Sequence, residues 1–593
     1  MSSPTTLLYI LFYHCVTFII RIDAHPIRQE TVEQMVGGLI SLEALQWSQK
    51  SQIELPVCEL CHMAVPLARL LIEIGEMDEL ETLLTDFCVD FKLFDKDICL
   101  GAIHEYKHVV VEVLTKAHLT DQQLCAITFG CEKQSDFPVF SWNVTFPDKP
   151  KPPPQPPQPP APESPKLNVL HLSDIHVDFG YKPGSIVDCS APLCCRGVSL
   201  VTSGNRSAGF WGDYGHCDLP QWTAKAILKH IADIEKIDFV YYTGDLPPHD
   251  VWNQSREDQI YSINTINQWL VDLFPNKIFY STVGNHEAAP CNLYPTPSVR
   301  SDNISWLYEV LADSWIKLGL PNDTRDSILR GAFYTTIIRS GFRLISLNMN
   351  YCPKENYWLY INSTDPLGQL QWLIQWLQYA EDQGEKVHLI GHHPPQDCLA
   401  AFRETFSRCI RYENTIAGQF YGHRHNDEFA VVYDEVDTKR PVSMMYIGPS
   451  LTTESFLNPG YRIFSMDGDY PGYRIFSMDG DYPGSSYWVL DHRTVIMNLT
   501  AANMYNTTIS VDEYNARDSY QMKNLFPEDW GDLIERMQTD IDGPLMSLAY
   551  THYTKSYQNG THCDHNCRQG LLCGFKTSRS EDFHACDSIP SGR

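Results

Sequence analysis

The chain has 593 residues, which is too long for a single ordinary core, so we expect two to four domains. A composition of 43% hydrophobic and 12% aromatic residues describes a globular protein with ample core. The formal charge of −28 argues against nucleic acid as a partner, because no broad basic face would neutralise phosphates, and it suits a protein that works in acid.

Residues 1–24 are predicted to be a secretory signal peptide. The apolar run 7–20 is too short to span a bilayer comfortably, and Ala24 ends the segment at a suitable cleavage point. No Lys or Arg precedes the run, so an uncleaved anchor is the alternative. We therefore expect a protein that is secreted, lysosomal or both.

The cysteines and the glycosylation sequons agree with secretion. Loss of Cys15 with the signal leaves 18 of the 19 cysteines, an even number that fits complete disulfide pairing. Nine Asn-x-Ser/Thr sequons predict a glycoprotein. They are Asn143, Asn205, Asn253, Asn303, Asn322, Asn362, Asn498, Asn506 and Asn559.

Residues 54–135 are predicted to form a helical domain. Apolar residues recur at helical spacing in 67–74, 80–87 and 106–113, which predicts four or five amphipathic helices. The domain holds six cysteines: Cys58, Cys61, Cys88, Cys99, Cys125 and Cys131. The Cys-x-x-Cys at 58–61 also occurs in zinc and redox sites, but secretion and the four further cysteines argue against both.

The cysteine spacing resembles that of saposin-type lipid-interacting domains. This resemblance implies the nested pairs Cys58–Cys131, Cys61–Cys125 and Cys88–Cys99. A plain helical interaction module is the alternative. A proline-rich segment follows at 147–165, and its extended polyproline conformation makes it a semi-rigid linker between domains.

Residues 166–433 alternate β-like runs with helical stretches such as 223–234 and 369–382, which predicts an α/β domain. Five short apolar runs each precede a polar motif, at 169–172, 239–243, 278–283, 387–390 and 419–421. Loops after parallel strands converge on one sheet edge, so we expect seven side chains to meet there. They are Asp174, His176, Asp245, Asn285, His392, His423 and His425.

Each motif alone has an ordinary explanation, since Gly-Asp and Gly-Asn-His are common turns and a lone His392 is more often a structural histidine. Five motifs in one order, all at predicted strand ends, favour a metal site instead. One Asp bridges two cations, and a glycine before a ligand lets the backbone turn sharply. Mixed imidazole, carboxylate and amide ligands suit Zn, Fe or Mn better than Ca or Mg.

This series resembles the calcineurin-like metallophosphoesterases. The resemblance implies two packed sheets flanked by helices, two divalent ions and attack of an activated water on phosphorus. It assigns the seven ligands to the two ions, with Asp245 shared: Asp174, His176, Asp245 and His425 on one, and Asn285, His392 and His423 on the other. His286 and His249 are candidates for the acid that protonates the leaving alkoxide. A loop histidine paired with Asp250 is the alternative for His249.

The remaining cysteines are expected to pair locally. Adjacent Cys194 and Cys195 do not readily pair with each other, which favours Cys189–Cys194 and Cys195–Cys217. Cys352 is expected to join Cys398, and elimination leaves Cys291 with Cys409. Residues 434–593 are predicted to be a mainly helical region with a helix near 529–538 and two short disulfide loops formed by Cys563, Cys567, Cys573 and Cys586.

Twelve residues occur twice in tandem, at 459–470 and 471–482, and each copy reads as a strand followed by an Asp-Gly turn. Two copies are too few for a solenoid, which needs at least three units. We expect one copy to keep a native strand and the other to bulge out as a loop or an edge hairpin.

The order of saposin-like unit, proline linker, phosphoesterase and cysteine-rich tail resembles the acid sphingomyelinase family, as do the segments 362–366, 388–392 and 411–415. The resemblance implies that a zinc enzyme hydrolyses sphingomyelin to ceramide and phosphocholine, with the saposin-like unit acting at a membrane surface. His393 and Arg424 depart from the family pattern without removing a ligand. The alternatives are a nucleotide or other phospholipid phosphodiesterase and a lipid-binding protein with an inactive phosphoesterase.

Overall fold

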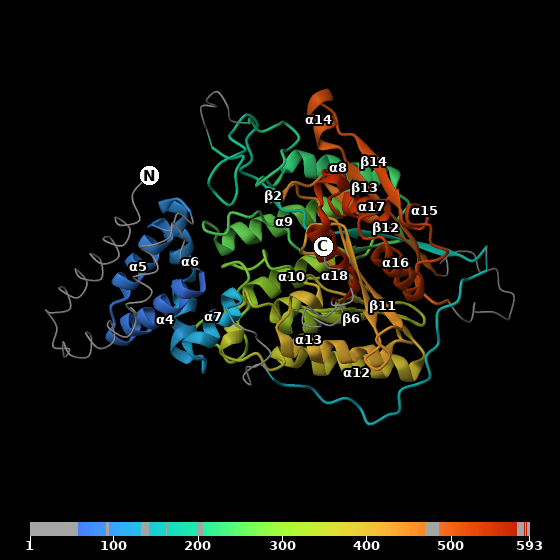
Figure 1. Cartoon of the computed structure of the whole chain (residues 1–593), viewed down its shortest axis with the longest axis horizontal. Helices are drawn as coiled ribbons and strands as arrows, with labels where there is room; N and C mark the ends of the chain where they lie inside the picture. The colour runs from blue at the N-terminus through green and yellow to red at the C-terminus, as the bar shows by residue number, and fades with distance from the viewer. Residues whose placement is uncertain are drawn as a thin grey trace. The chain divides into compact units, whose positions relative to one another are not determined.

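The computed structural model describes residues 57–90, 94–131, 141–161, 163–197, 206–468 and 485–577, with Cys586 and Ile589 (Figure 1). The predicted signal peptide, Cys15 and the Asn205 sequon lie outside these residues. The chain divides into two units by its internal contacts: residues 1–80 with 119–137, and residues 81–118 with 138–593.

The first unit is built on α4 (Val57–Ile74) and α7 (Asp121–Phe129). Disulfides join Cys58 to Cys131 and Cys61 to Cys125, and Arg69 Nε lies 2.8 Å from an Asp121 carboxylate oxygen. α7 begins at a capping box, in which the Thr120 side chain accepts from the backbone N–H of Gln123. These constraints fix the pairing of α4 with α7, which has nine residues and would be marginal alone.

The intervening helices α5 (Met77–Asp90) and α6 (Lys96–Lys116) are tied by the Cys88–Cys99 disulfide. α6 belongs to the second unit, where Tyr106 Oη donates to the Cys291 carbonyl at 3.0 Å and His108 lies 3.9 Å from Asp302. Residues 54–135, expected as one domain, are therefore shared between two units, because α6 presents polar side chains to loops of the phosphoesterase region.

Two mixed six-stranded sheets form the centre of the second unit. The first has the order β14-β13-β12-β1-β4-β5, in which β1, β4 and β5 are parallel. Its strands are β1 (Lys166–Leu172), β4 (Phe239–Tyr242), β5 (Phe279–Ser281), β12 (Gly460–Asp467), β13 (Val489–Met497) and β14 (Ser510–Asn515). A separate two-stranded ladder pairs β2 (Val177–Asp178) with β3 (Leu219–Pro220).

The second sheet has the order β10-β11-β9-β8-β7-β6, in which β7, β8, β9 and β11 run parallel. Its strands are β6 (Tyr334–Arg339), β7 (Phe342–Ser346), β8 (Lys386–Ile390), β9 (Ile416–Tyr421), β10 (Glu428–Tyr433) and β11 (Pro441–Ile447). The two sheets pack face to face through aromatic side chains. Phe420 on β9 meets Phe464 on β12 and Tyr241 on β4, with ring centroids 5.0 and 4.8 Å apart.

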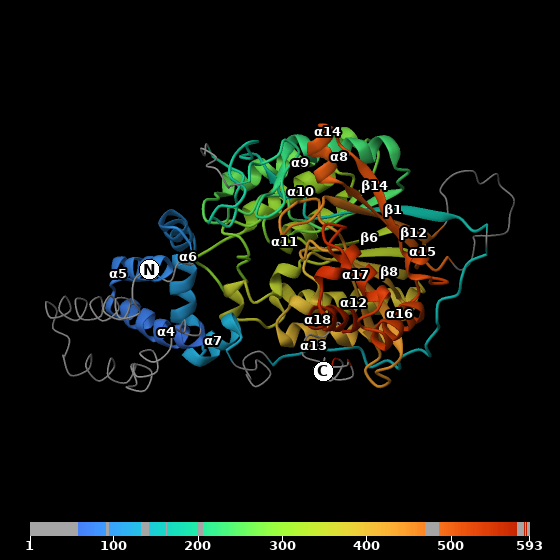
Figure 2. The same ribbon diagram turned by 45° about the horizontal axis from the view of Figure 1, so that its top comes forward.

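Helices cover both outer faces of this sandwich, as Figures 1 and 2 show, with the α8–α10 layer on one side and α12 and α13 on the other. They are α8 (Gln221–Ile234), α9 (Arg256–Leu273), α10 (Ser305–Lys317), α11 (Arg325–Gly331), α12 (Gln369–Gln383) and α13 (Ala400–Ser407). Short 3₁₀ turns span Asn322–Thr324, Met349–Tyr351, Tyr357–Tyr360, Pro366–Gly368, Pro395–Asp397, Arg408–Tyr412 and Gly560–His562. The predicted α/β fold is confirmed.

The region after residue 434 differs from the expected mainly helical one. β11 completes the second sheet and β12–β14 complete the first, so both sheets cross the expected boundary. The described part of this region also contains the helices α14 (Leu499–Tyr505), α15 (Ala516–Tyr520), α16 (Pro527–Thr539), α17 (Pro544–Tyr553) and α18 (His565–Lys576). α16 and α18 cover the second sheet, where Phe429 contacts Trp530 and Phe575 at ring distances of 4.3 Å.

The first copy of the duplicated segment forms β12, which pairs antiparallel with both β1 and β13. The second copy, 471–482, lies outside the described residues. None of the described helices is both long enough and apolar enough to cross a bilayer.

The second unit's other disulfides join Cys189 to Cys194, Cys195 to Cys217, Cys352 to Cys398, Cys563 to Cys567 and Cys573 to Cys586. The expected Cys291–Cys409 disulfide is wrong, because both thiols are free and buried. Cys291 Sγ lies 3.8 Å from the side-chain amide nitrogen of Asn285, whereas Cys409 packs in the core beneath the second sheet. Elimination failed because an even number of cysteines does not require every one to be oxidised.

Candidate metal centre

The seven predicted side chains do meet, on loops that follow five parallel strands. Asp174 and His176 follow β1, Asp245 follows β4 and Asn285 follows β5. His392 follows β8 of the second sheet, and His423 and His425 follow β9. All except the half-buried His423 are buried. The carboxyl ends of strands from both sheets therefore carry one cluster of polar side chains.

The backbone of these loops is held in unusual conformations. Five of the seven side chains belong to residues with positive φ, between 40° and 74°: Asp174, His176, Asp245, His423 and His425. Glycines allow the loops to cross closely, because a Cβ on Gly284 would stand 2.1 Å from Asp245 Oδ1 and one on Gly422 would stand 2.2 Å from Ser173 Oγ. Strain of this kind persists only where the surrounding structure enforces it, and it concentrates at functional sites.

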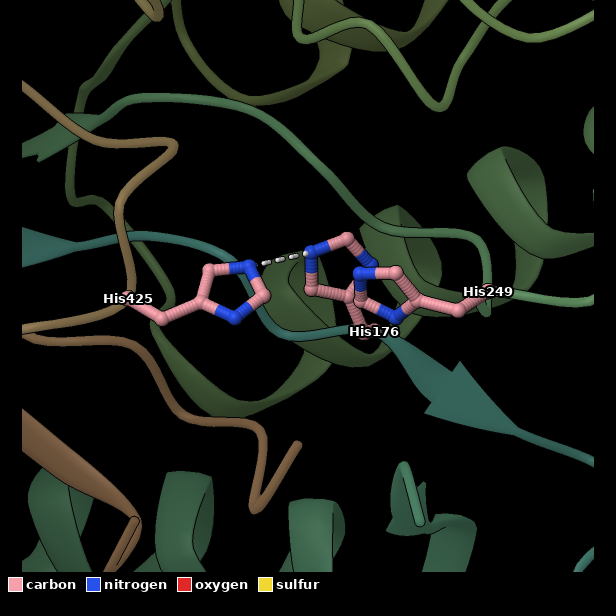
Figure 3. A group of neighbouring side chains, drawn as sticks. All are labelled: His176, His249 and His425. Carbon is pink, nitrogen blue, oxygen red and sulfur yellow. Dashed lines mark hydrogen bonds between the residues drawn. The ribbon is translucent and has the colours of Figure 1, made fainter. Parts of the chain in front are cut away.

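Four side chains enclose what we name the first position. His425 Nε2 lies 3.2 Å from His176 Nε2 and 3.7 Å from Asp174 Oδ1. His176 Nε2 lies 3.5 Å from Asp245 Oδ2. Figure 3 shows the imidazoles of His425 and His176 pointing at each other through these nitrogens.

The donor set of the first position fits a cation. The Nδ1 of His176 donates to the Pro247 carbonyl at 2.7 Å, and the Nδ1 of His425 faces a Glu454 carboxylate oxygen at 3.3 Å. Each ring then carries its lone pair on Nε2, and two lone pairs facing each other at 3.2 Å repel unless a positive ion lies between them. The arrangement matches the way in which ligating histidines are oriented by their other nitrogen.

The second position is enclosed by Asn285, His392 and His423. Asn285 Oδ1 lies 2.9 Å from His392 Nε2 and 3.1 Å from His423 Nδ1. His392 Nε2 is also 3.1 Å from Asp245 Oδ2, while its Nδ1 donates to the Thr243 carbonyl at 2.6 Å. Asp245 thus lies against both positions, as a bridging carboxylate must.

Two acidic residues that support the site carry no motif in the sequence. Glu287 accepts from the backbone N–H groups of Gly284 and Leu246 at 2.8 and 2.9 Å, which ties together the two loops that carry Asn285 and Asp245. Glu454 orients His425 from a loop nearly thirty residues further along the chain. Burial raises the pKa of Glu454, but the imidazole of His425 outweighs that effect and holds this pKa well below its usual range.

The two candidate proton donors lie beside the first position. The ring of His249 lies 4.1 Å from that of His176 and 4.5 Å from that of His286, measured between centroids. His249 Nδ1 pairs with Asp218 Oδ1 at 2.9 Å, so the alternative pairing with Asp250 is wrong. Asp250 instead accepts from Arg196.

These two histidines differ in their protonation. Burial would lower the pKa of His249, but the Asp218 carboxylate outweighs burial and raises this pKa to about 9. Burial lowers the pKa of His286 to about 4. His249 therefore keeps its proton in acid and at neutral pH, and it is the better placed of the two to give a proton to a leaving group.

His393 and Arg424, the two residues that depart from the family pattern, have different surroundings. Arg424 lies 2.6 Å from Asp397 and 3.1 Å from Glu428, so its charge is used in ion pairs. His393 is buried next to the second position.

Away from the site, all eight sequon asparagines in the described part of the chain are exposed, as a glycan requires.

Comparison with known proteins gives the following matches. The calcineurin-like phosphoesterase family model matches residues 167–427, and that of the acid sphingomyelin phosphodiesterase C-terminal region matches residues 440–588. A Bos taurus sphingomyelin phosphodiesterase is 42% identical over 84% of this chain and 78% of its own length, and the Homo sapiens protein of that name is 40% identical over 85% and 78%. A Homo sapiens cyclic GMP-AMP phosphodiesterase is 28% identical over 70% of this chain and 89% of its own.

Proposed function

The chain belongs to the sphingomyelin phosphodiesterase family of calcineurin-like phosphoesterases, and from this membership we propose that it hydrolyses sphingomyelin to ceramide and phosphocholine in acid. Water adds to phosphorus, the bond from phosphorus to the ceramide oxygen breaks, and the ceramide alkoxide takes up a proton. The chain supplies the acid for that last step.

The observation that carries this proposal is the position of the Asp245 carboxylate between the two sets of ligand atoms. Its Oδ2 lies 3.5 Å from His176 Nε2 of the first position and 3.1 Å from His392 Nε2 of the second. Divalent ions bound at the two positions supply an activated water and positive charge for the phosphoryl oxygens. We propose zinc, because imidazole, carboxylate and amide donors together suit this metal.

His249 is the proposed proton donor. Its Nδ1 is fixed by Asp218, which leaves Nε2 as the nitrogen that can donate to a bound substrate. Its side chain is 20% exposed and so reaches solvent, whereas His286 is buried and hydrogen-bonds the Pro248 carbonyl through Nδ1 at 3.3 Å. His286 accordingly acts by holding the loop beside the first position.

The membrane is the proposed partner of the saposin-like helices. Large apolar side chains remain exposed there: Phe94 and Leu100 in the second unit are 43% and 37% exposed, and Phe129 in the first is 54% exposed. Such side chains suit contact with a lipid surface. Residence in the lysosome or outside the cell is proposed from the eight disulfides, which persist in oxidising compartments.

Turnover tests the function directly. We expect the purified full chain to release phosphocholine from sphingomyelin vesicles in acid, to do so much faster than it cleaves a soluble nucleotide diester, and to stop when a chelator removes its metal. Faster cleavage of the nucleotide would favour the second candidate, a nucleotide phosphodiesterase, for which the similarity to the cyclic GMP-AMP phosphodiesterase is the specific support. Absence of turnover on both substrates after metal loading would leave a lipid-binding protein.

A further inference from the structure

His393 is a fully buried histidine whose imidazole is unsatisfied. Only 1% of the residue is exposed, and neither Nδ1 nor Nε2 has a hydrogen-bond partner within the part of the chain that the structure describes. Buried polar atoms are almost always paired, because leaving them bare costs the whole of their lost hydration. An imidazole with both nitrogens bare therefore indicates a missing partner.

The surroundings of His393 identify the kind of partner. Its ring lies 3.9 Å from that of His423 and 5.2 Å from that of His392, measured between centroids. One ligand nitrogen from each of the three rings lies within 4.8 Å of the other two. Two nitrogens that bind one zinc ion at about 2.1 Å are at most about 4.2 Å apart, so small ring rotations bring all three into range.

The local backbone explains how two consecutive residues face the same space. Neighbouring side chains on a strand point to opposite faces, but β8 ends at Ile390 and the chain bends at both His392 and His393. Pro394 then fixes the direction in which the chain leaves. The bend turns the imidazole of His393 toward His423 instead of away from it.

We propose that His393 is a third imidazole ligand of the second position, beside His392 and His423. This inference rests on the proposed metal-dependent function. It adds one ligand to the metal centre, and that ligand belongs to the second position alone. With Asn285 and the shared Asp245, the second position has five protein donors. Three imidazoles favour zinc and cobalt over manganese or magnesium there.

A second buried histidine provides the matched comparison. His492 on β13 is 3% exposed and its Nδ1 also has no partner among the described residues. Its neighbours are the rings of Trp530, Tyr446 and Tyr514, and it belongs to none of the clusters of metal-binding side chains among the described residues. His492→Leu therefore removes a buried imidazole with one unpaired nitrogen without touching the metal centre.

The experiment uses the full chain stripped of metal by chelator and titrated with Co²⁺, whose visible absorption reports the number and type of its ligands. We expect the wild-type protein to bind two ions. In His393→Leu the second ion should bind at least about tenfold more weakly and its absorption band should change, while the first ion binds as before. His492→Leu should leave both ions and the spectrum unchanged.

His393→Gln is a second variant that keeps the test valid if His393→Leu fails to fold. Glutamine has hydrogen-bonding groups and a similar size, but it lacks the imidazole. The second ion should bind more weakly to this variant as well, and the absorption band of that ion should change. Wild-type affinity and an unchanged spectrum in a folded His393→Leu or His393→Gln would overturn the proposed ligand while leaving the two-metal centre intact. A wild-type protein that binds no Co²⁺ would instead overturn the metal-dependent function, and this inference with it.

Discussion

The two metal positions share Asp245 but differ in charge and in the way their ligands are held. The first has a second carboxylate, Asp174, and its His425 is backed by a third, Glu454. The second has a neutral amide, Asn285, and no carboxylate of its own. A cation at the second position is therefore less neutralised by the protein, and we infer that the anionic phosphoryl oxygens bind mainly there.

The proton donor adds to this difference. His249 and His286 both lie against His176 of the first position. The first position thus lies beside the proposed acid, whereas the second is the one that we infer attracts the substrate's charge. Variants that remove one position or both test this division of labour.

Loss of the shared carboxylate should have the largest effect. Asp245→Ala removes the one ligand common to both positions, so we expect both ions to be lost and turnover to fall by at least about 10³-fold. His423→Ala should empty the second position and leave the first occupied. Metal content after gel filtration, read together with turnover, checks this; two tightly held ions in Asp245→Ala would contradict a shared ligand.

Loss of the acid comes next. His249→Ala should slow sphingomyelin hydrolysis by about 10²- to 10⁴-fold, because the ceramide alkoxide then leaves without a proton. An aryl phosphodiester with an activated leaving group needs no proton and should lose far less. His286→Ala, tested in parallel, should not discriminate between the two substrates in this way. Equal losses on both substrates for His249→Ala would assign it a role at the metal centre instead.

The sequence predicted that the seven side chains meet at strand ends because each motif is local: an apolar run, a turn and a polar side chain lie within a few residues. It did not predict Glu454, Asp218 or Glu287, because their contacts join distant loops and each is an ordinary acidic residue in the sequence. The strand in the first duplicated copy was expected and is β12, but its place in the first sheet was not predicted, and β13 and β14 were missed. β12 pairs with β1, β13 with β12 and β14 with β13, and these pairings depend on long-range register, which the sequence near 460–515 does not display.

Glu454 gives a test confined to the first position. Glu454→Gln keeps the shape but removes the charge that orients His425, so we expect the first ion to bind about 10- to 100-fold more weakly with little change at the second. Asp397→Asn is a suitable control, because Asp397 pairs with Arg424 instead of a ligand. Weakening of both ions to the same degree would mean that the two positions are not independently supported.

The Asp218–His249 pair predicts a pH dependence. The pKa of His249 in the folded protein is about 9, above its ordinary 6.5, so the pair's stabilisation is complete below pH 6.5 and is lost as the pH rises through about 9. In the chelator-treated protein, Asp218→Asn should therefore lower the free energy of unfolding by about 2–3 kcal/mol near pH 5 and much less above about pH 10. Chemical denaturation at both pH values measures the difference.

Activity should follow the same titration. In Asp218→Asn the proton of His249 is lost at lower pH, so the alkaline limb of the pH profile of kcat/KM should shift to lower pH for sphingomyelin. The profile for the activated aryl phosphodiester should stay in place. A profile that is unchanged for sphingomyelin would remove His249 as the acid and leave the pair a structural role.

Deleting one copy of the tandem duplication should have the smallest effect, because β12, which the first copy forms, carries none of the side chains of the two metal positions. β12 is formed by the first copy, and its end meets the start of β13 directly: Asp467 N–H donates to the Trp488 carbonyl at 3.0 Å, and Ser486 N–H donates to Asp467 at 2.7 Å. The chain from 469 to 484 has only to connect these two points. Deleting either copy gives the same sequence, so one variant tests the duplication itself.

Deletion of residues 471–482 leaves four of the sixteen residues 469–484, among them a Pro-Gly pair suited to a tight turn. Shortening the connection fourfold lowers the entropy cost of closing it by about 1 kcal/mol, so we expect unchanged turnover and a stability equal to the wild type or higher by about that amount. Replacing the twelve residues with a Gly/Ser segment of equal length is the control, since it keeps the length but not the sequence. Reduced turnover or stability in both variants would show that the second copy is part of the core or the substrate cleft.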